Sequence, residues 1–438
     1  MICCRGDPAV SRRQRLFATT LVGSALVAWV ACGGSGATPT CTPGQSVACT
    51  CSDGSWGAQV CGSSGTLGAC TCTSGDAGAG SSSGSGSSSG SGSSSGSSSG
   101  AMDSGPGNPC AAGQSLCHGV CVDEANDPAN CGSCGTACGG TCTRGACLLV
   151  LASQQLAPGD LALDAKNVYF SNVNAPGSVV AVPLGGGAAT TLAMGLGTPQ
   201  AIAVDATGAY TTDVTGGTIM RTALDGSGHA PLVSAQTTPT NLVLDATAAH
   251  VYWTTGTAGM VVSATVPGGV ATTLASGRSS PDAIAVDGAH VYWSDPVDGV
   301  VMSLPLAGGS PATLASGLGS PADLAVDATS VYWVDYAKGV VMKVALGGGK
   351  ATTLASGQAQ PDAITVDAKS VYWTNEGGNL NGSVVRVPLA GGSPTTLVDG
   401  LDSPGSFGGL AIDAKSVYWA IDPQGGTGTG AVMKLTPR

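Results

Sequence analysis

The C-terminal two thirds of this chain repeats itself about every 40 residues, and this repeat constrains the fold more than any other feature. Each copy carries an aspartate and, a few residues later, a tyrosine; only Tyr336 among the eight tyrosines lies outside this pattern. The aspartates are Asp164, Asp205, Asp245, Asp287, Asp327, Asp367 and Asp413. The last five copies place a tryptophan after the tyrosine, at Trp253, Trp293, Trp333, Trp373 and Trp419. Seven copies of such a unit indicate a repeat architecture.

Each copy has the pattern of four short strands. In residues 361–400, "AITVD" alternates apolar and polar residues, and "SVYWT" is rich in aromatic and β-branched residues. A third strand, "GSVVRVPL", is followed by a Gly-Gly turn and a fourth strand, "PTTLV". Four strands per unit, seven times over, predict an all-β fold: a seven-bladed β-propeller of four-stranded blades across residues 148–438. A linear β-solenoid is the alternative.

The two ends of the repeat region favour the closed ring. The seventh copy stops on its third strand, "GAVMKLTPR", while a sequence typical of a fourth strand, "LVLASQQLAP", precedes the first copy. We therefore expect residues 149–153 to pair with residues 432–435 and complete the last blade. A closed ring removes the exposed sheet edges that a solenoid keeps at its ends.

The phrases "YWSD" (292–295) and "YWTN" (372–375) resemble the YWTD class of propeller, and the repeat as a whole is similar to NHL-like bacterial propellers. The resemblance covers about 290 residues. It implies a non-catalytic scaffold that binds a protein or another ligand.

The N-terminus has the features of an export signal. Basic residues precede an apolar run over residues 16–31, which ends in "ACGG". This junction resembles a bacterial lipobox and predicts a signal peptide over residues 1–31 with lipidation of Cys32. The prediction is a lipoprotein of the Gram-negative cell envelope; Gly33 after the cysteine favours the outer membrane. A plain secretory signal, and hence a secreted protein, is the alternative.

Fourteen further cysteines fall into two even groups, in residues 32–72 and 110–147, and none follows Cys147. Even groups on an exported chain indicate disulfide-rich modules. The cysteines concerned are Cys41, Cys49, Cys51, Cys61, Cys70 and Cys72, then Cys110, Cys117, Cys121, Cys131, Cys134, Cys138, Cys142 and Cys147. "DPANCGSCGTAC" in the second group resembles the stigma-specific (Stig1-like) cysteine-rich repeat. The Gly/Ser tract between the modules, residues 73–109, is expected to be a disordered linker.

Little in the sequence indicates catalysis. The formal net charge of −11 argues against nucleic acid or an anionic membrane surface as a partner. His250 and His290 occupy the same position of the repeat, and no His/carboxylate cluster has metal spacing. The Cys131–Cys134 pair is expected in disulfides rather than in a zinc or redox site. The repeated aspartates are expected to cap turns, with a ring of Ca²⁺ ligands as the alternative. We predict no catalytic residue, no metal and no cofactor.

Residues that depart from the repeat are the better candidates for contact with a ligand. They lie in the loops between the second and third strands: Asp298, Tyr336, Lys338, Glu376, Asn379 and Asp422. The sequence thus predicts a monomeric, lipid-anchored envelope protein that presents a non-catalytic propeller to an envelope or extracellular protein or glycan. An envelope propeller enzyme, of lyase or lactonase type, is the alternative.

Overall fold

The computed structural model describes residues 46–50, 56–60, 71–72, 110–377, 382–401, 406–422 and 430–437. All regular structure in these residues is β-strand, and they contain no helix that could cross a membrane. The predicted signal peptide, Cys32 and the Gly/Ser linker lie outside the described residues.

The chain separates into two units. In residues 21–102, β1 (Ser46–Thr50), β2 (Trp56–Val60) and β3 (Thr71–Cys72) form one three-stranded sheet. Cys49 and Cys72 belong to β1 and β3, whereas Cys41, Cys51, Cys61 and Cys70 lie outside the described residues, so the disulfide pairing of this group stays a prediction.

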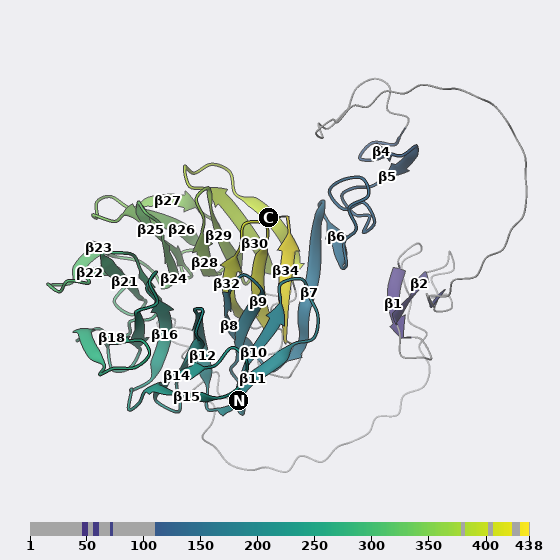
Figure 1. Ribbon diagram of the computed structural model, residues 1–438. Coiled ribbons are helices and arrows are strands. Elements are labelled where there is room, and N and C mark those ends of the chain that lie inside the picture. The colour runs from purple at the N-terminus through teal and green to yellow at the C-terminus, as the bar shows by residue number, and fades with distance from the viewer. Residues whose placement is uncertain are drawn as a thin grey trace, which may run out of the picture. The chain divides into compact units, whose positions relative to one another are not determined.

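The second unit holds the seven predicted blades, arranged as a wheel (Figure 1). Blades 1 to 3 consist of β8 (Pro158–Leu163), β9 (Asn167–Asn172), β10 (Gly177–Pro183) and β11 (Thr190–Leu196); β12 (Pro199–Val204), β13 (Ala209–Asp213), β14 (Thr218–Thr222) and β15 (His229–Val233); and β16 (Pro239–Leu244), β17 (His250–Thr255), β18 (Met260–Thr265) and β19 (Thr272–Ala275).

Blades 4 to 6 follow the same order. They consist of β20 (Ile284–Val286), β21 (His290–Asp295), β22 (Val300–Pro305) and β23 (Ala312–Ala315); β24 (Pro321–Val326), β25 (Ser330–Asp335), β26 (Val340–Ala345) and β27 (Thr352–Ala355); and β28 (Pro361–Val366), β29 (Ser370–Asn375), β30 (Gly382–Pro388) and β31 (Thr395–Leu401).

The seventh blade closes the ring as the sequence predicts. β32 (Ser406–Ile412), β33 (Val417–Asp422) and β34 (Gly430–Thr436) are joined by β7 (Ala146–Gln155) from the other end of the repeat region. Val432 pairs with Ala152 and Leu435 with Leu148, and the innermost strands β32 and β8 are in contact. The closed, seven-bladed wheel is therefore confirmed and the solenoid alternative is wrong.

The adjacent tyrosine and tryptophan explain how the blades pack. Side chains of successive strand residues point to opposite faces of a sheet, so the two rings face different neighbours. Trp333 of blade 5 lies in one core cluster with Tyr292 of blade 4, and Trp419 of blade 7 with Tyr372 of blade 6. Phe170 of blade 1 meets Tyr418 of blade 7 in the same way. The aromatic pair is thus a blade-to-blade contact that continues around the closed ring.

The repeated aspartate caps the turn before the second strand, as expected. Asp287 Oδ1 accepts the backbone N–H groups of Ala289 and His290, both at 2.6 Å. Its Oδ2 accepts the hydroxyl of Tyr292 at 2.8 Å, which fixes the spacing between the two residues. In blade 3 the turn is two residues longer, and His250 Nδ1 lies 3.1 Å from Asp245 Oδ2 instead.

The second cysteine group forms a small module with little apolar core. β4 (Ser115–Cys117) and β5 (Val120–Val122) form a hairpin, and β6 (Thr141–Thr143) pairs with the start of β7. All eight cysteines are paired, as Cys110–Cys121, Cys117–Cys134, Cys131–Cys142 and Cys138–Cys147. The two cysteines of the CxxC sequence belong to different disulfides. Such a framework indicates an extracellular or envelope location.

Candidate functional site

The connections between strands divide the propeller into two faces. Strands alternate in direction within each blade, so the loops between the second and third strands emerge beside the loops that lead into each first strand. We call this side the loop face. The hairpin turns after the first and third strands emerge on the opposite side, which we call the turn face. The five predicted contact residues that the structure describes belong to the loop-face connections or to the strand end beside them.

A buried acid at the end of the second strand holds the loop face together. Asp335 is fully buried, and its carboxylate accepts N–H groups from Gly319 at 2.7 Å and Ser320 at 3.0 Å in the preceding loop. It also accepts the N–H of Lys338, at 3.0 Å, from the following loop. One side chain therefore joins two loops that are separate in sequence. Asp213 and Asp295 make equivalent bonds in blades 2 and 4.

Blades 1 and 6 use an amide in place of this acid. Asn375 donates from Nδ2 to Gln358 Oε1 at 3.1 Å and to Ser383 Oγ at 3.2 Å. Asn172 makes the same two bonds, to Gln155 and to Ser178. Gln155 is the last residue of β7 and Gln358 lies in the loop before β28, and each stands three residues before the first strand of its blade.

In blades 3 and 6 the glutamine at this position also binds the tryptophan of its blade. Trp373 Nε1 donates to Gln358 Oε1 at 3.0 Å, and in blade 3 Trp253 Nε1 donates to Gln236 at 3.2 Å. The blades that end their second strand in aspartate have another residue at the glutamine position: Leu196, Arg278, Leu318 and Leu401. In three of these blades the buried indole N–H has no hydrogen-bond partner, at Trp293, Trp333 and Trp419. An aspartate at the end of the second strand thus occurs without the glutamine and an asparagine occurs with it, while blade 3 combines the glutamine with Thr255.

A second set of polar residues lies on the innermost strands or, for Asp282, two residues before one, around the centre of the wheel (Figure 1). Asp160 Oδ2 accepts the N–H of Ile202, and Asp323 Oδ2 accepts the N–H of Ile364. Asn241 donates to Asp282 Oδ1 at 2.8 Å. Each bond crosses to the next blade and ties blades 1 and 2, 3 and 4, or 5 and 6. The sequence analysis missed these residues, although their alternation between neighbouring copies is visible in the sequence.

The predicted contact residues are engaged with the protein itself. Tyr336 donates its hydroxyl to Glu376 Oε2 at 2.8 Å, which joins the loops of blades 5 and 6. Lys338 Nζ donates to the carbonyl of Gly317 at 2.5 Å, and exposed Asp298 accepts the hydroxyl of Ser279. Glu376 and Asp422 are buried. Asn379 lies outside the described residues.

The histidines lie away from the loop face. His229 begins the outermost strand of blade 2, and His250 and His290 begin second strands, so all three lie at the turn face. His118 belongs to the cysteine-rich module. All four histidines of the chain are among the described residues. A site that combines a histidine with the loop-face carboxylates is therefore not formed.

Among the described residues, Cys117, Glu124 and Cys134 are the one group of three potential metal ligands. The two sulfurs are joined in a disulfide, so neither is a thiolate that could bind a metal.

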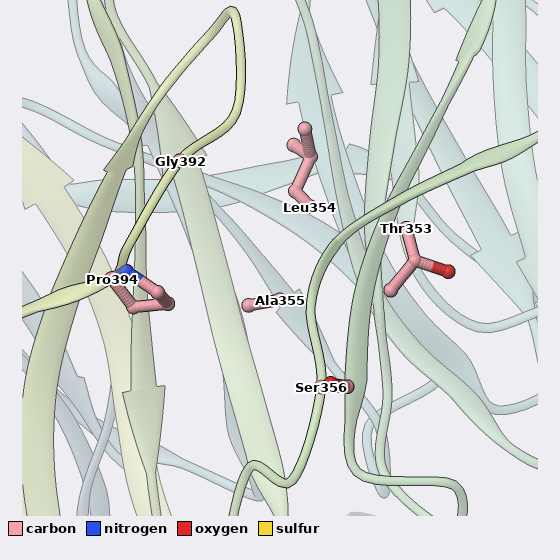
Figure 2. A pocket seen from close by; sticks show the side chains of 6 residues that line it. All are labelled: Thr353, Leu354, Ala355, Ser356, Gly392 and Pro394. Atoms are coloured by element: carbon pink, nitrogen blue, oxygen red, sulfur yellow. The ribbon is translucent and has the colours of Figure 1, made fainter.

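One small cavity, of about 240 Å³, lies at the outer rim between blades 5 and 6 (Figure 2). Thr353, Leu354, Ala355 and Ser356 line one side, and Gly392 and Pro394 line the other. Outer-strand leucines approach the glycine turn of the next blade elsewhere as well: a Cβ on Gly348 would lie 3.7 Å from Leu314 Cδ2. The cavity is therefore one instance of a repeated packing seam.

No family model and no curated protein matches this sequence. The fold is similar to a streptogramin B lyase structure, with a TM-score of 0.55 at 12% identity over 67% of this chain and 98% of that one. It is also similar to a catalytically inactive histidine-to-alanine variant of virginiamycin B lyase from Staphylococcus aureus with quinupristin, with a TM-score of 0.56 at 14% identity over 67% of this chain and 99% of that one. A nidogen/laminin complex aligns over 52% of this chain and 90% of that one at 22% identity, but its TM-score of 0.44 supports no inference. At these identities the similarity to the lyases shows a shared propeller fold.

Proposed function

We propose that this chain is a lipid-anchored envelope protein whose propeller binds a protein or glycan through its loop face, without catalysis. The observation that carries the proposal is the bonding by Asp213, Asp295 and Asp335, each of which joins two loops of that face. A surface whose loops are fixed before binding loses less conformational entropy when a partner is bound.

The position of the cysteine-rich module supports the same role. β7 is the fourth strand of blade 7, so it starts at the turn face, where Cys147 pairs with Thr436, and ends at the loop face with Gln155. The chain from an N-terminal anchor therefore reaches the propeller at the turn face. In an anchored protein, the loop face is therefore the face opposite the one at which the anchored chain enters the propeller.

A lyase of the streptogramin type is the competing function, because the propeller fold is shared with those enzymes. The virginiamycin B lyase variant that lacks activity has a histidine replaced by alanine. In this chain the histidines at the propeller lie at the turn face, remote from the loop-face carboxylates. This distribution favours binding over elimination chemistry. Turnover of quinupristin by the purified full chain would overturn the non-catalytic part of the proposal.

To test the binding role, the full chain is immobilised on a support, incubated with envelope extract and cross-linked to the components that it binds. Lys338→Glu reverses one charge on the loop face, and Lys369→Glu makes the same change at an exposed turn-face position. We expect a specific captured component to be lost with Lys338→Glu and retained with Lys369→Glu. Equal capture by both variants contradicts a loop-face site.

Anchoring is tested separately, by mass spectrometry of the mature N-terminus. The expected product begins at Cys32 and carries lipid, and Cys32→Ser releases the protein from the membrane fraction. A mature chain with an unmodified residue 32 contradicts the lipid anchor but leaves the binding role of the propeller intact.

A further inference from the structure

The cysteine-rich module and the propeller share one strand. β7 begins inside the module, at Ala146, and continues without a linker into the last blade. We propose that the module is a latch: it holds β7 in place and thereby keeps the propeller ring closed. This proposal is independent of what the loop face binds.

The ring has one place where it can open. Every other blade is built from four consecutive strands, whereas blade 7 depends on the pairing of β34 with β7, across more than half of the chain. We call this pairing the seam. Loss of β7 would leave β34 as an unpaired edge and remove Leu151 and Ala152 from the core cluster between blades 7 and 1.

Disulfides fix the start of β7 where it enters the seam. Cys138–Cys147 binds the first seam residue, since Cys147 pairs with Thr436. Cys147 also pairs with Cys142 of β6, and Cys142 is bonded to Cys131. The beginning of the seam strand is therefore held on both sides, by β34 and by a cross-linked hairpin.

The module also contacts the neighbouring blade. Arg144, in the turn between β6 and β7, reaches the outermost strand of blade 6, where its Nη2 lies 2.5 Å from Asp399 Oδ2. Its Nη1 donates to the carbonyl of Thr396 at 3.4 Å. Ala146 and Leu148 pack against the core cluster that blades 6 and 7 share, and Leu149 packs against the cluster of blades 7 and 1. The module and the adjoining residues of β7 together thus contact the three blades around the seam.

The proposal predicts a local effect that a passive spacer would not produce. Cys138→Ser with Cys147→Ser removes the disulfide at the seam, which closes a separation of 9 residues. We expect amide hydrogen exchange in β7 and β34 of the full chain to become about tenfold faster or more. Exchange in blade 3, across the ring, is expected to stay unchanged.

Cys110→Ser with Cys121→Ser is the matched control, because it removes a disulfide of similar separation, 11 residues, from the far part of the module. Seam exchange should stay as in the wild type. If the control variant accelerates the seam as much as Cys138→Ser/Cys147→Ser does, or if neither accelerates it, the latch is overturned.

A milder variant keeps the proposal testable if removal of Cys138–Cys147 prevents folding. Arg144→Ala breaks only a half-exposed ion pair, so the chain should fold. We expect exchange in β7 to rise about two- to fivefold, consistent with the loss of a surface contact. Exchange at the wild-type rate in this variant would show that the module does not hold the seam through blade 6.

Discussion

At the scale of single residues, every blade except blade 3 couples a carboxylate to an aromatic hydroxyl. Asp327 Oδ1 accepts two backbone N–H groups, at 2.7 and 2.8 Å, and its Oδ2 accepts the hydroxyl of Tyr332 at 2.8 Å. The sequence analysis identified the turn-capping aspartate and the buried aromatic ring, but not the bond between them. That bond joins the second strand to the turn after the first strand: Tyr332 pairs with Ala325, and its hydroxyl reaches Asp327 two residues further on.

Tyr332→Phe should destabilise the protein by about 1–2 kcal/mol, because the hydroxyl donates to an ionised carboxylate. Tyr252→Phe is the matched control, since the carboxylate of Asp245 is held by His250 in blade 3. We expect the control to lose less than half as much. Urea unfolding of the two variants measures the difference, and equal losses would show that the hydroxyl bond to Asp327 contributes nothing of its own.

Asp335→Asn should cost about 2–3 kcal/mol, because three backbone N–H groups lose a charged acceptor in a buried site. Blades 1 and 6 tolerate asparagine at this position because a glutamine three residues before the first strand of the blade, Gln155 or Gln358, accepts its N–H group. Adding Leu318→Gln supplies that partner and an acceptor for the unpaired indole N–H of Trp333. The double variant should recover about half of the lost stability in chemical denaturation. If the double variant loses as much stability as the two single variants together, the proposed pairing of asparagine with glutamine is contradicted.

At the scale of elements, the turns before the second strands of blades 5 and 7 respond to pH. Burial raises the pKa of Asp327 and Asp413, but hydrogen bonds from backbone amides and the tyrosine hydroxyl outweigh it, and each pKa lies below its ordinary value. Burial, with the hydrogen bond to the neighbouring carboxylate, raises the pKa of Tyr332 and Tyr418 above the ordinary value of 10.0. The turns therefore favour one protonation state: ionised aspartate with neutral tyrosine.

The free energy of unfolding should be constant between about pH 5 and 9, and it should fall at lower and at higher pH. A carboxyl with a lowered folded pKa contributes stability above its ordinary value of 3.8, and this contribution is lost as the pH falls through the folded pKa. A tyrosine with a raised folded pKa contributes stability below pH 10.0, and this contribution is lost as the pH rises further. Melting temperature against pH tests both limbs. In Tyr332→Phe the alkaline fall should be smaller; an unchanged alkaline limb would contradict this assignment.

At the scale of the whole molecule, the fold could be predicted from the sequence. The repeat shows the pattern of strands in each blade and also shows where within a blade the repeat region begins and ends. The missing fourth strand at "GAVMKLTPR" and the extra strand at residues 149–153 predicted the closure that Val432 and Ala152 make. The loop face could not be derived in the same way. Its bonds join residues of different loops, such as Asp335 with Gly319, and the inner bonds join different blades, such as Asn241 with Asp282. A pattern within one copy does not contain these partners.

Ring closure by a distant strand has a consequence that can be tested in trans. A chain that lacks residues 1–155 keeps all strands of the propeller except β7 and exposes the edge of β34. Because an unpaired strand edge is a template for association, this chain should self-associate, and size-exclusion chromatography would detect it. A synthetic peptide of residues 146–155 should restore a monomeric elution volume by pairing with β34. A peptide in which Leu149, Leu151 and Ala152 are replaced by aspartate keeps the backbone donors but cannot fill the core between blades 7 and 1, and it should fail. Restoration by both peptides would mean that the seam is held by backbone pairing alone, and persistent association with both would mean that closure requires the covalent connection through the module.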